Sequence, residues 1–325
     1  MSDGTLPAAL TALIERINNS LRQVLEEDEC FFGEIGIYSL IGGGKRLRPM
    51  IFCLSSGALG SEIDDEVVKL SLTFELLHMA TLMHDDIVDQ SDTRRGRPAV
   101  HHIFGVPETV LAADYLLAKA GLMSLSKKNL EAVILVIELI RELSLGELAE
   151  LKASHRVDLQ TSEYFDIIYR KTAVLLETVG NTAACLVGAG PNESRALSEY
   201  GRRMGLAFQI IDDIFDYRSK AGTLGKPVGQ DLAEGRITLP FILARDNLAG
   251  FDRQRLLELG AILNPSEEVR LEARSLVEKG SGSDLSMAEA QRQAKQAAGA
   301  LEVLPPTAER DLLVELAYYT VKRDR

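Results

Sequence analysis

Apolar residues recur every three to four positions along most of this chain, which is the spacing of one buried face of an α-helix. The pattern predicts helices from Val67 to the first group of aspartates and then over residues 108–125, 129–154, 161–188, 194–217, 237–248, 266–279, 286–302 and 307–322. No convincing alternation of apolar and polar residues, which would be typical of a strand, interrupts them. The sequence therefore predicts an all-α protein.

Several predicted helices are apolar on nearly every side. The segments LEAVILVIELI and TAACLVGAG are examples, and such helices in a soluble protein lie at the centre of the core. Loops are expected where glycine, proline or charge gathers, at residues 42–46, 92–107, 219–235 and 280–284. No internal repeat divides the chain. We predict one domain over residues 1–325, a bundle of long helices around a central cavity.

Charge and cysteine content narrow the class of protein. The chain has 48 acidic and 36 basic residues and a formal net charge of −12, which argues against a nucleic-acid surface and against binding to anionic membranes. Cys30, Cys53 and Cys185 lie far apart, as expected of thiols in a reducing cytosol. No signal peptide and no apolar run of about 18 residues is seen. We expect a cytoplasmic protein without stable membrane insertion.

An acid-rich motif follows a strongly apolar helix. HDDIVDQSDTRRG places Asp85, Asp86 and Asp89 within five residues. Asp85 and Asp89 share one helical face, where like charges cost an isolated helix about 0.2–0.5 kcal/mol. A carboxylate pair at the end of a buried helix needs a cation, and oxygen ligands without nearby cysteine or clustered histidine favour Mg²⁺.

A second motif repeats this spacing. IDDIFDY carries Asp212, Asp213 and Asp216, again on an apolar helical run. One such motif would fit the solvated end of a helix equally well, but two copies on two apolar helices argue against that interpretation. Acid pairs facing each other across a helical cavity would hold several Mg²⁺ ions against one diphosphate. We therefore expect a site that ionises a diphosphate.

A basic, glycine-rich loop precedes the first acid motif. GGGKRLRP joins three glycines to Lys45, Arg46 and Arg48, and Arg94 and Arg95 follow the acids further along the chain. Glycine-rich loops and helix N-termini bind phosphate, and arginines offer paired planar donors for it. The nucleotide-binding sequence GxxxxGK[ST] is absent and no strand precedes the loop. We favour a phosphate-binding loop over a solvated turn and exclude a nucleotide P-loop.

The chain resembles the trans-isoprenyl diphosphate synthases, the polyprenyl synthetase family, and its medium- and long-chain bacterial members. Five motifs occur in the same order: GGGKRLRP, HDDIVDQSDTRRGRP, YRKTAVLLETV, FQIIDDIFDY and GKPVGQDLAEGRITLP. The resemblance extends from about residue 40 to the C-terminus. It implies the all-α isoprenoid synthase fold, a homodimer and the head-to-tail addition of isopentenyl diphosphate to an allylic diphosphate. It also implies three Mg²⁺ ions per active site, for which Mn²⁺ can substitute.

The resemblance further implies roles for individual residues. Metal binding falls to Asp85 and Asp89 on one wall and Asp212 on the other, with Asp86, Asp213 and Asp216 in support. The positions for isopentenyl diphosphate are Lys45, Arg48, His78 and Arg95. Those around the allylic diphosphate are Arg94, Lys171, Thr172, Gln209, Lys226 and Arg236, of which Arg94, Lys171, Thr172 and Gln209 are also assigned to catalysis.

The chemistry of these residues agrees with the resemblance. His78 lies two helical turns before Asp85 on the same face, although a lone histidine there would normally be interpreted as part of the core. Lys171–Thr172 places a cation in an apolar helix, where an unpaired lysine is costly. No side chain is an obvious base, and in this family the bound diphosphate is thought to accept the departing proton. No role is assigned to His84, His101, His102 and His155.

Three positions depart from the usual family pattern. Glu150 stands where glutamine is common, Arg236 stands where lysine is usual, and AAD at 112–114 replaces a G-D step. None of these changes removes a metal ligand. A class I terpene cyclase would have a different second motif, and a non-catalytic subunit of a heteromeric synthase would have lost acids that are intact here. A synthase is therefore favoured over both.

The length of the product is predicted from the helix before the first acid motif. In this family, bulky aromatic residues four or five positions before the first aspartate stop growth at short products. Ala80 and Thr81 stand there and are small, whereas Phe74 and Leu77 would form a deeper floor unless both are simply core residues. The hypothesis is an octaprenyl-like product, longer than farnesyl, and the alternative is a short-chain farnesyl or geranylgeranyl diphosphate synthase.

Overall fold

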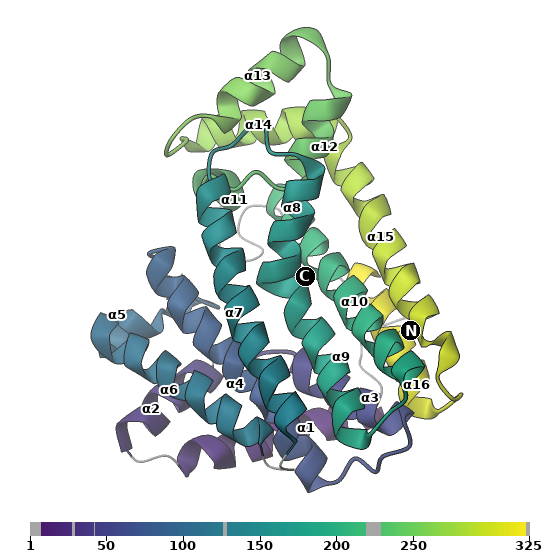
Figure 1. Cartoon of the computed structure of the whole chain (residues 1–325). Helices are drawn as coiled ribbons and strands as arrows, with labels where there is room; N and C mark the ends of the chain where they lie inside the picture. Colours follow the sequence, from purple (N-terminus) through teal and green to yellow (C-terminus); the bar gives the residue numbers. More distant parts are fainter. Residues whose placement is uncertain (1–7, 28–29, 42, 126–128, 219–228, 323–325) are drawn as a thin grey trace. The chain divides into compact units, whose positions relative to one another are not determined.

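Helices account for most of the computed structural model, which describes residues 8–27, 30–41, 43–125, 129–218 and 229–322 (Figure 1). This confirms the all-α prediction. The elements are α1 (Ala8–Glu26), α2 (Cys30–Ile41), α3 (Leu47–Ala58), α4 (Asp65–Val88), β1 (Thr93–Arg94), β2 (Arg97–Pro98), α5 (Val100–Phe104), α6 (Val106–Ser124), α7 (Leu130–Ala153), α8 (Thr161–Ile168), the π-helical turn η1 (Tyr169–Ala173), α9 (Val174–Val187), α10 (Pro191–Arg218), α11 (Gln230–Ala233), α12 (Leu239–Asn247), α13 (Gly250–Gly260), α14 (Glu267–Lys279), α15 (Gly282–Ala300), the 3₁₀ turn η2 (Leu301–Val303) and α16 (Ala308–Lys322).

The described residues pack into two compact units. Unit 1 consists of residues 1–138, 178–197 and 303–313, and unit 2 of residues 139–177, 198–302 and 314–325. The first acid motif belongs to unit 1 and the second to unit 2. The single domain over residues 1–325 stays a prediction.

Helix α4 is the central helix of unit 1. Its N-cap residue Asp64 accepts a 2.8 Å hydrogen bond from the backbone N–H of Val67, and acids occupy its first turn, where the helix dipole favours them. Most of its remaining side chains are buried against α3 and α6, and Phe74 packs on Phe52 of α3. The buried flanks hold α4 in place, so that its C-terminal end can carry the acid motif.

The core of unit 2 surrounds the second acid motif. Ile210, Ile211 and Ile214 of α10 pack with residues of α8, α12, α14 and α15. Glycines let the backbones come close: a Cβ on Gly205 of α10 would lie 2.4 Å from Cα of Ala173 in η1. Because no side chain fits there, α10 and η1 are fixed against each other.

The segment predicted as a loop over residues 92–107 is more ordered than expected, and that prediction is wrong. It contains the hairpin β1–β2 and the short helix α5. Arg95 and Gly96 connect the strands with φ angles of 53° and 75°, and positive φ at both central residues is the condition for a tight type I′ hairpin turn. Strands of two residues are too short to produce an alternating pattern, which is why the sequence did not indicate them.

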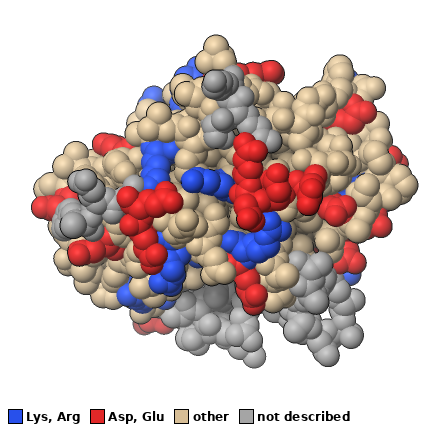
Figure 2. Space-filling model, turned by 90° about the horizontal axis from the view of Figure 1, so that it is seen from below, with Lys and Arg blue, Asp and Glu red and all other residues tan. Residues whose placement is uncertain are grey.

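The surface offers few further constraints on function. No helix in the described part of the chain is long and apolar enough to cross a membrane. On the face shown in Figure 2, acidic and basic side chains lie next to one another instead of forming separate areas.

Candidate active site

The C-terminal end of α4 concentrates negative charge. The helix is continuous from Asp65 to Val88 and Asp89 is its C-cap, so Asp85 and Asp89 follow each other along one face, as predicted. Both side chains are half-buried. The C-terminus of a helix is itself partially negative, and the last turn of α4 contains no basic residue. Two carboxylates at such an end favour a divalent cation.

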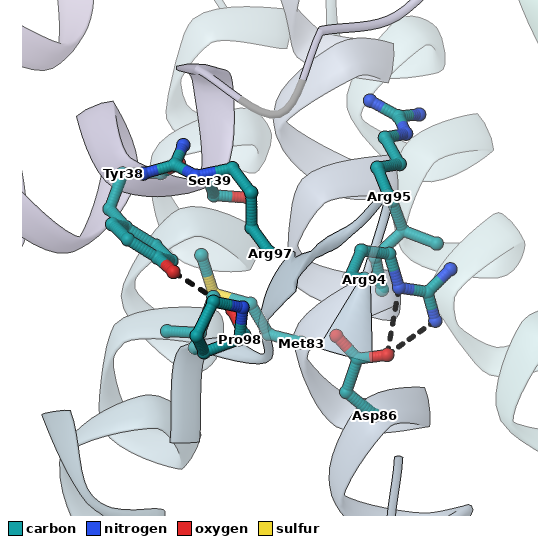
Figure 3. A pocket seen from close by; sticks show the side chains of 10 residues that line it. Tyr38, Ser39, Met83, Asp86, Arg94, Arg95, Arg97 and Pro98 are labelled. Atoms are coloured by element: carbon teal, nitrogen blue, oxygen red, sulfur yellow. Dashed lines mark hydrogen bonds and ion pairs between the residues drawn. The ribbon is translucent and has the colours of Figure 1, made fainter. Parts of the chain in front are cut away.

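Asp86, the middle acid of the first motif, is more buried than Asp85 and Asp89 and is hydrogen-bonded to Arg94. It is 2% exposed, and its Oδ1 accepts hydrogen bonds of 2.8 Å from Nε and 2.5 Å from Nη2 of Arg94 (Figure 3). A buried carboxylate bonded in this way fixes the position of the hairpin strand β1. The contact favours a supporting role for Asp86, while its place in the metal group stays a prediction.

The hairpin is also held from its other strand. The guanidinium of Arg97 stacks 4.3 Å above the ring of Tyr38, whose hydroxyl donates a 2.9 Å hydrogen bond to the carbonyl of Pro98. Arg95, at the turn, extends away from Asp86 (Figure 3). A small pocket behind the hairpin is lined by Tyr38, Ser39, Leu82, Met83, Asp86, Arg94, Arg95, Arg97, Pro98 and Val100. Because both strands of the hairpin are anchored, Arg95 is held at the turn between them.

The three cations of the basic loop have different surroundings. Arg46 is buried, and it donates hydrogen bonds of 2.6 Å to Oε1 of Glu75 and 2.8 Å to Oδ1 of Asn18. Its φ of 50° is left-handed, so the loop turns sharply at this residue. Lys45 is exposed and Arg48 half-buried. Arg46 therefore anchors the loop, and contact of Lys45 and Arg48 with a diphosphate stays a prediction.

His78 lies among the arginines of unit 1. Burial lowers the pKa of its imidazole well below the ordinary value, and the positive charges of Arg48, Arg95 and Arg94 lower it further. The structure thus brings together three residues predicted for isopentenyl diphosphate: Arg48, His78 and Arg95. A neutral imidazole among guanidinium groups can still donate one hydrogen bond to an anion.

The second group of site residues begins at a π-helical turn. Lys171 and Thr172 lie in η1, between α8 and α9, where the sequence predicted an uninterrupted helix. Such turns are rare and frequently mark functional sites. The Nζ of Lys171 lies 3.1 Å from Oε2 of Glu147 and also contacts Oε2 of Glu150, both on α7.

A chain of hydrogen bonds connects η1 to the second acid motif. Oγ1 of Thr172 donates to Oε1 of Gln209 at 2.8 Å, and Nε2 of Gln209 donates to Oδ1 of Asp213 at 2.8 Å. The hydroxyl of Tyr164 donates to the other oxygen, Oδ2, at 2.6 Å. Burial raises the pKa of Asp213 and that of Tyr164. The chain makes Thr172, Gln209 and Asp213 neighbours, while their roles at the site stay predictions.

Asp216 caps the short helix α11. Its two carboxylate oxygens accept the backbone N–H groups of Gln230 at 2.9 Å and Asp231 at 3.1 Å. Asp231 in turn accepts from Arg236 at 3.0 Å, and Glu234 also pairs with this arginine. Burial raises the pKa of Asp231 to about 7. Arg236 is therefore engaged by acids of its own segment, and its contact with a diphosphate stays a prediction.

Two polar residues near the second acid motif were not predicted from the sequence, and one predicted residue lies outside the described part of the chain. Tyr164 and Asp231 join the acid group of unit 2, and the only signal for Tyr164 was its place two turns before Lys171. Lys226 lies outside the described residues. Asp212 is half-buried on α10.

The acid motifs fit Mg²⁺ by their donor chemistry. They offer carboxylate oxygens, the ligands that Mg²⁺ prefers. Within the described ranges, no three carboxylate, imidazole or thiol side chains are grouped closely enough to hold a metal by themselves. Binding of Mg²⁺ by these acids stays a prediction.

Comparison with known proteins places this arrangement in a family. Residues 31–275 match the Polyprenyl synthetase family. The chain belongs to this family. It is 36% identical over 310 residues to the octaprenyl diphosphate synthase of Escherichia coli, covering 95% of each chain. It is 34% identical over 314 residues to a short chain isoprenyl diphosphate synthase of Methanothermobacter thermautotrophicus, again covering 95% of each.

A solved structure agrees with these relatives. The decaprenyl diphosphate synthase of Rhodobacter capsulatus superimposes with a TM-score of 0.89 at 29% identity, covering 98% of both chains. Membership of the polyprenyl synthetase family confirms the predicted resemblance, the isoprenoid synthase fold and the prenyltransferase class of the enzyme. The individual site roles stay predictions.

Proposed function

We propose that this polyprenyl synthetase adds isopentenyl diphosphate head-to-tail to an allylic diphosphate and makes an all-trans product of octaprenyl-like length. The observation that carries the proposal is in unit 1, where the acid face of α4 also bears His78, surrounded by the charges of Arg48, Arg94 and Arg95. Carboxylates for a metal and donors for a diphosphate thus belong to one surface. The octaprenyl diphosphate synthase relative supports the length.

The residues of unit 1 account for binding of the isopentenyl substrate. Guanidinium groups bind phosphate oxygens in pairs, and Arg95 is held ready at a hairpin turn. His78 adds a donor without adding charge, because its imidazole is neutral. Lys45 supplies an exposed, flexible cation.

The residues of unit 2 account for binding of the allylic substrate. Lys171 offers an ammonium and Thr172 a hydroxyl, and Gln209 and Asp213 orient the hydroxyl of Thr172 through the hydrogen-bond chain. We assign metal binding to Asp85 and Asp89 in unit 1 and to Asp212 in unit 2; Mg²⁺, when bound, would supply positive charge that stabilises the departing diphosphate. The isopentenyl double bond attacks the carbocation that remains and forms the new C–C bond, and the resulting cation loses a proton to the released diphosphate.

Product analysis tests this function. The purified protein should be incubated with Mg²⁺, radiolabelled isopentenyl diphosphate and either geranyl, farnesyl or geranylgeranyl diphosphate, and the products separated by chain length. We expect mainly octaprenyl-like products and no incorporation with chelator present. A product that stops at farnesyl contradicts the proposed length, and no incorporation with any primer contradicts the function.

Lys45→Ala separates the two diphosphate sites. We expect the KM for isopentenyl diphosphate to rise about 10- to 100-fold, the value of one charge-assisted hydrogen bond, while the KM for the primer changes little. Steady-state kinetics with each substrate varied in turn measures both constants. Lys69→Ala, which removes an exposed lysine of α4, is the control. Equal effects on the two KM values would mean that the two sites have been merged or exchanged.

Phenylalanine at position 80 or 81 should shorten the product towards farnesyl without abolishing catalysis. Thr81 is half-buried and about 40° around α4 from Asp85, whereas Ala80 is fully buried and about 140° away. Ala80→Phe therefore risks overpacking, which costs about 1–3 kcal/mol, and Thr81→Phe has more room. Chain-length analysis measures the shift. Unchanged products from two folded variants would show that another helix closes the pocket.

We also propose that the protein is a homodimer, with a second copy covering apolar side chains of α6 and α7. Leu122 on α6 and Leu130 on α7 are 73% and 66% exposed, and Ile134 and Ile137 extend the exposed face of α7 by one and two turns. Side chains of this kind are normally covered in a stable protein. Light scattering should give twice the 35.6 kDa of one chain, and a monomer at micromolar concentration would contradict the proposal.

A further inference from the structure

Two carboxylates of α7 pair with the ammonium of Lys171. This ammonium lies 3.1 Å from Glu147 and contacts Glu150, and the three side chains are between 21% and 24% exposed. One turn earlier on α7, Glu142 accepts a 2.7 Å hydrogen bond from the neighbouring Arg170. Two cations of η1 thus meet three carboxylates of α7.

Close packing makes this contact a fixed part of unit 2. A Cβ on Gly146 of α7 would lie 2.7 Å from the backbone nitrogen of Lys171, so the two helices approach as closely as their backbones allow. Glu147 and Glu150 lie just beyond this point, three residues apart on one face of α7. The carboxylates therefore stay close to Lys171 and cannot simply move away with their helix.

A diphosphate that binds Lys171 must compete with these acids. Partly buried charges are screened less than exposed ones, so an extra carboxylate near the lysine opposes an incoming anion. Glu150 is the residue of the pair that departs from the usual glutamine. Glutamine at this position would keep an oxygen acceptor for Lys171 but would carry no negative charge.

We propose that Glu150 competes with diphosphate for Lys171. It holds the lysine when the allylic site is empty, and it recaptures the lysine as a diphosphate departs. Glu150 therefore weakens binding of any diphosphate at this site and speeds its release. The inference rests on the assignment of Lys171 to the allylic diphosphate in the proposed function.

Glu150→Gln tests the competition. We expect the dissociation constant of inorganic diphosphate, measured by calorimetry with Mg²⁺ present, to fall about three- to tenfold, and the KM of the allylic substrate to fall with it. The KM of isopentenyl diphosphate should not change. Glu142→Gln is the matched control, because it neutralises a carboxylate on the same helix that pairs with Arg170 instead, and it should leave diphosphate affinity unaltered.

The same substitution in a Lys171→Ala background shows whether the effect passes through the lysine. We expect Glu150→Gln to change diphosphate affinity by less than a factor of two there. An unchanged or weaker affinity in the single variant, or an equal gain in both backgrounds, overturns the proposal. The calorimetry needs no turnover, so a failure of this inference is distinct from a failure of prenyl transfer, which the incorporation assay detects.

Discussion

Asp85→Ala and Asp212→Ala should each lower turnover about a thousandfold while leaving the helical circular dichroism signal unchanged. Each removes a carboxylate assigned to metal, and with it positive charge that stabilises the departing diphosphate by several kcal/mol. Both side chains are half-buried, so their loss creates no large cavity in the core. Single-turnover rates at saturating Mg²⁺ measure the effect.

Asp92→Ala is the control for this pair. Asp92 follows the same motif, and its side chain is 90% exposed and pairs with His102 at 3.1 Å. Its removal should leave turnover within a factor of two, because exposed pairs contribute little. Near-normal turnover in the Asp85 or Asp212 variant would contradict the metal assignment.

Glu75→Ala should be the most destabilising single change in unit 1, at about 3–5 kcal/mol. The carboxylate pairs with Arg46 at 2.6 Å, and both side chains are only 5% exposed. Without Glu75, the guanidinium stays buried with no opposite charge against it. The midpoint of urea unfolding, followed by circular dichroism, should fall accordingly. The KM for isopentenyl diphosphate should also rise, because Arg46 anchors the loop that carries Lys45.

Two further variants make this result interpretable. Arg16→Ala breaks the exposed pair with Asp65, whose side chains are 44% and 100% exposed, and should cost less than about 1 kcal/mol. The double variant Arg46→Met, Glu75→Leu removes both buried charges and should recover much of the loss. A Glu75 variant no less stable than the Arg16 variant would show that the buried pair is not important for stability.

The helical fold was predictable because burial imposes one period over long segments. Predicted boundaries of residues 129–154 and 266–279 differ by about one residue from those of α7 and α14. The predicted ranges leave out α1, α2 and α13, which are 19, 12 and 11 residues long, and also α5 and α11, which are only five and four residues long. A periodic signal needs several turns, so elements as short as α5 and α11 are set by turn geometry and tertiary contacts.

The sequence indicated which residue types form the candidate site, but it did not indicate the different role of each residue. The spacing of Asp85 and Asp89 indicates a shared face from sequence alone. The sequence gives no means of separating Arg46 from Lys45 and Arg48, because only burial shows that Arg46 faces Glu75. Likewise, Asp213 and Asp86 differ from their neighbours through contacts with Tyr164 and Arg94, which the spacing of the aspartates does not indicate.

Because of the π-helical turn η1, the contacts of Tyr164 and Thr172 depend on the number of residues between them. Tyr164 and Thr172 would point about 80° apart on a regular α-helix, but a wider turn rotates less per residue and brings them towards one side. There they meet Asp213 and Gln209, which are four residues apart on α10. During evolution, a one-residue deletion in YRKTA would keep the helix and most of its composition yet separate these partners. A substitution on the outer side of η1 should disturb these contacts less than a deletion of one residue.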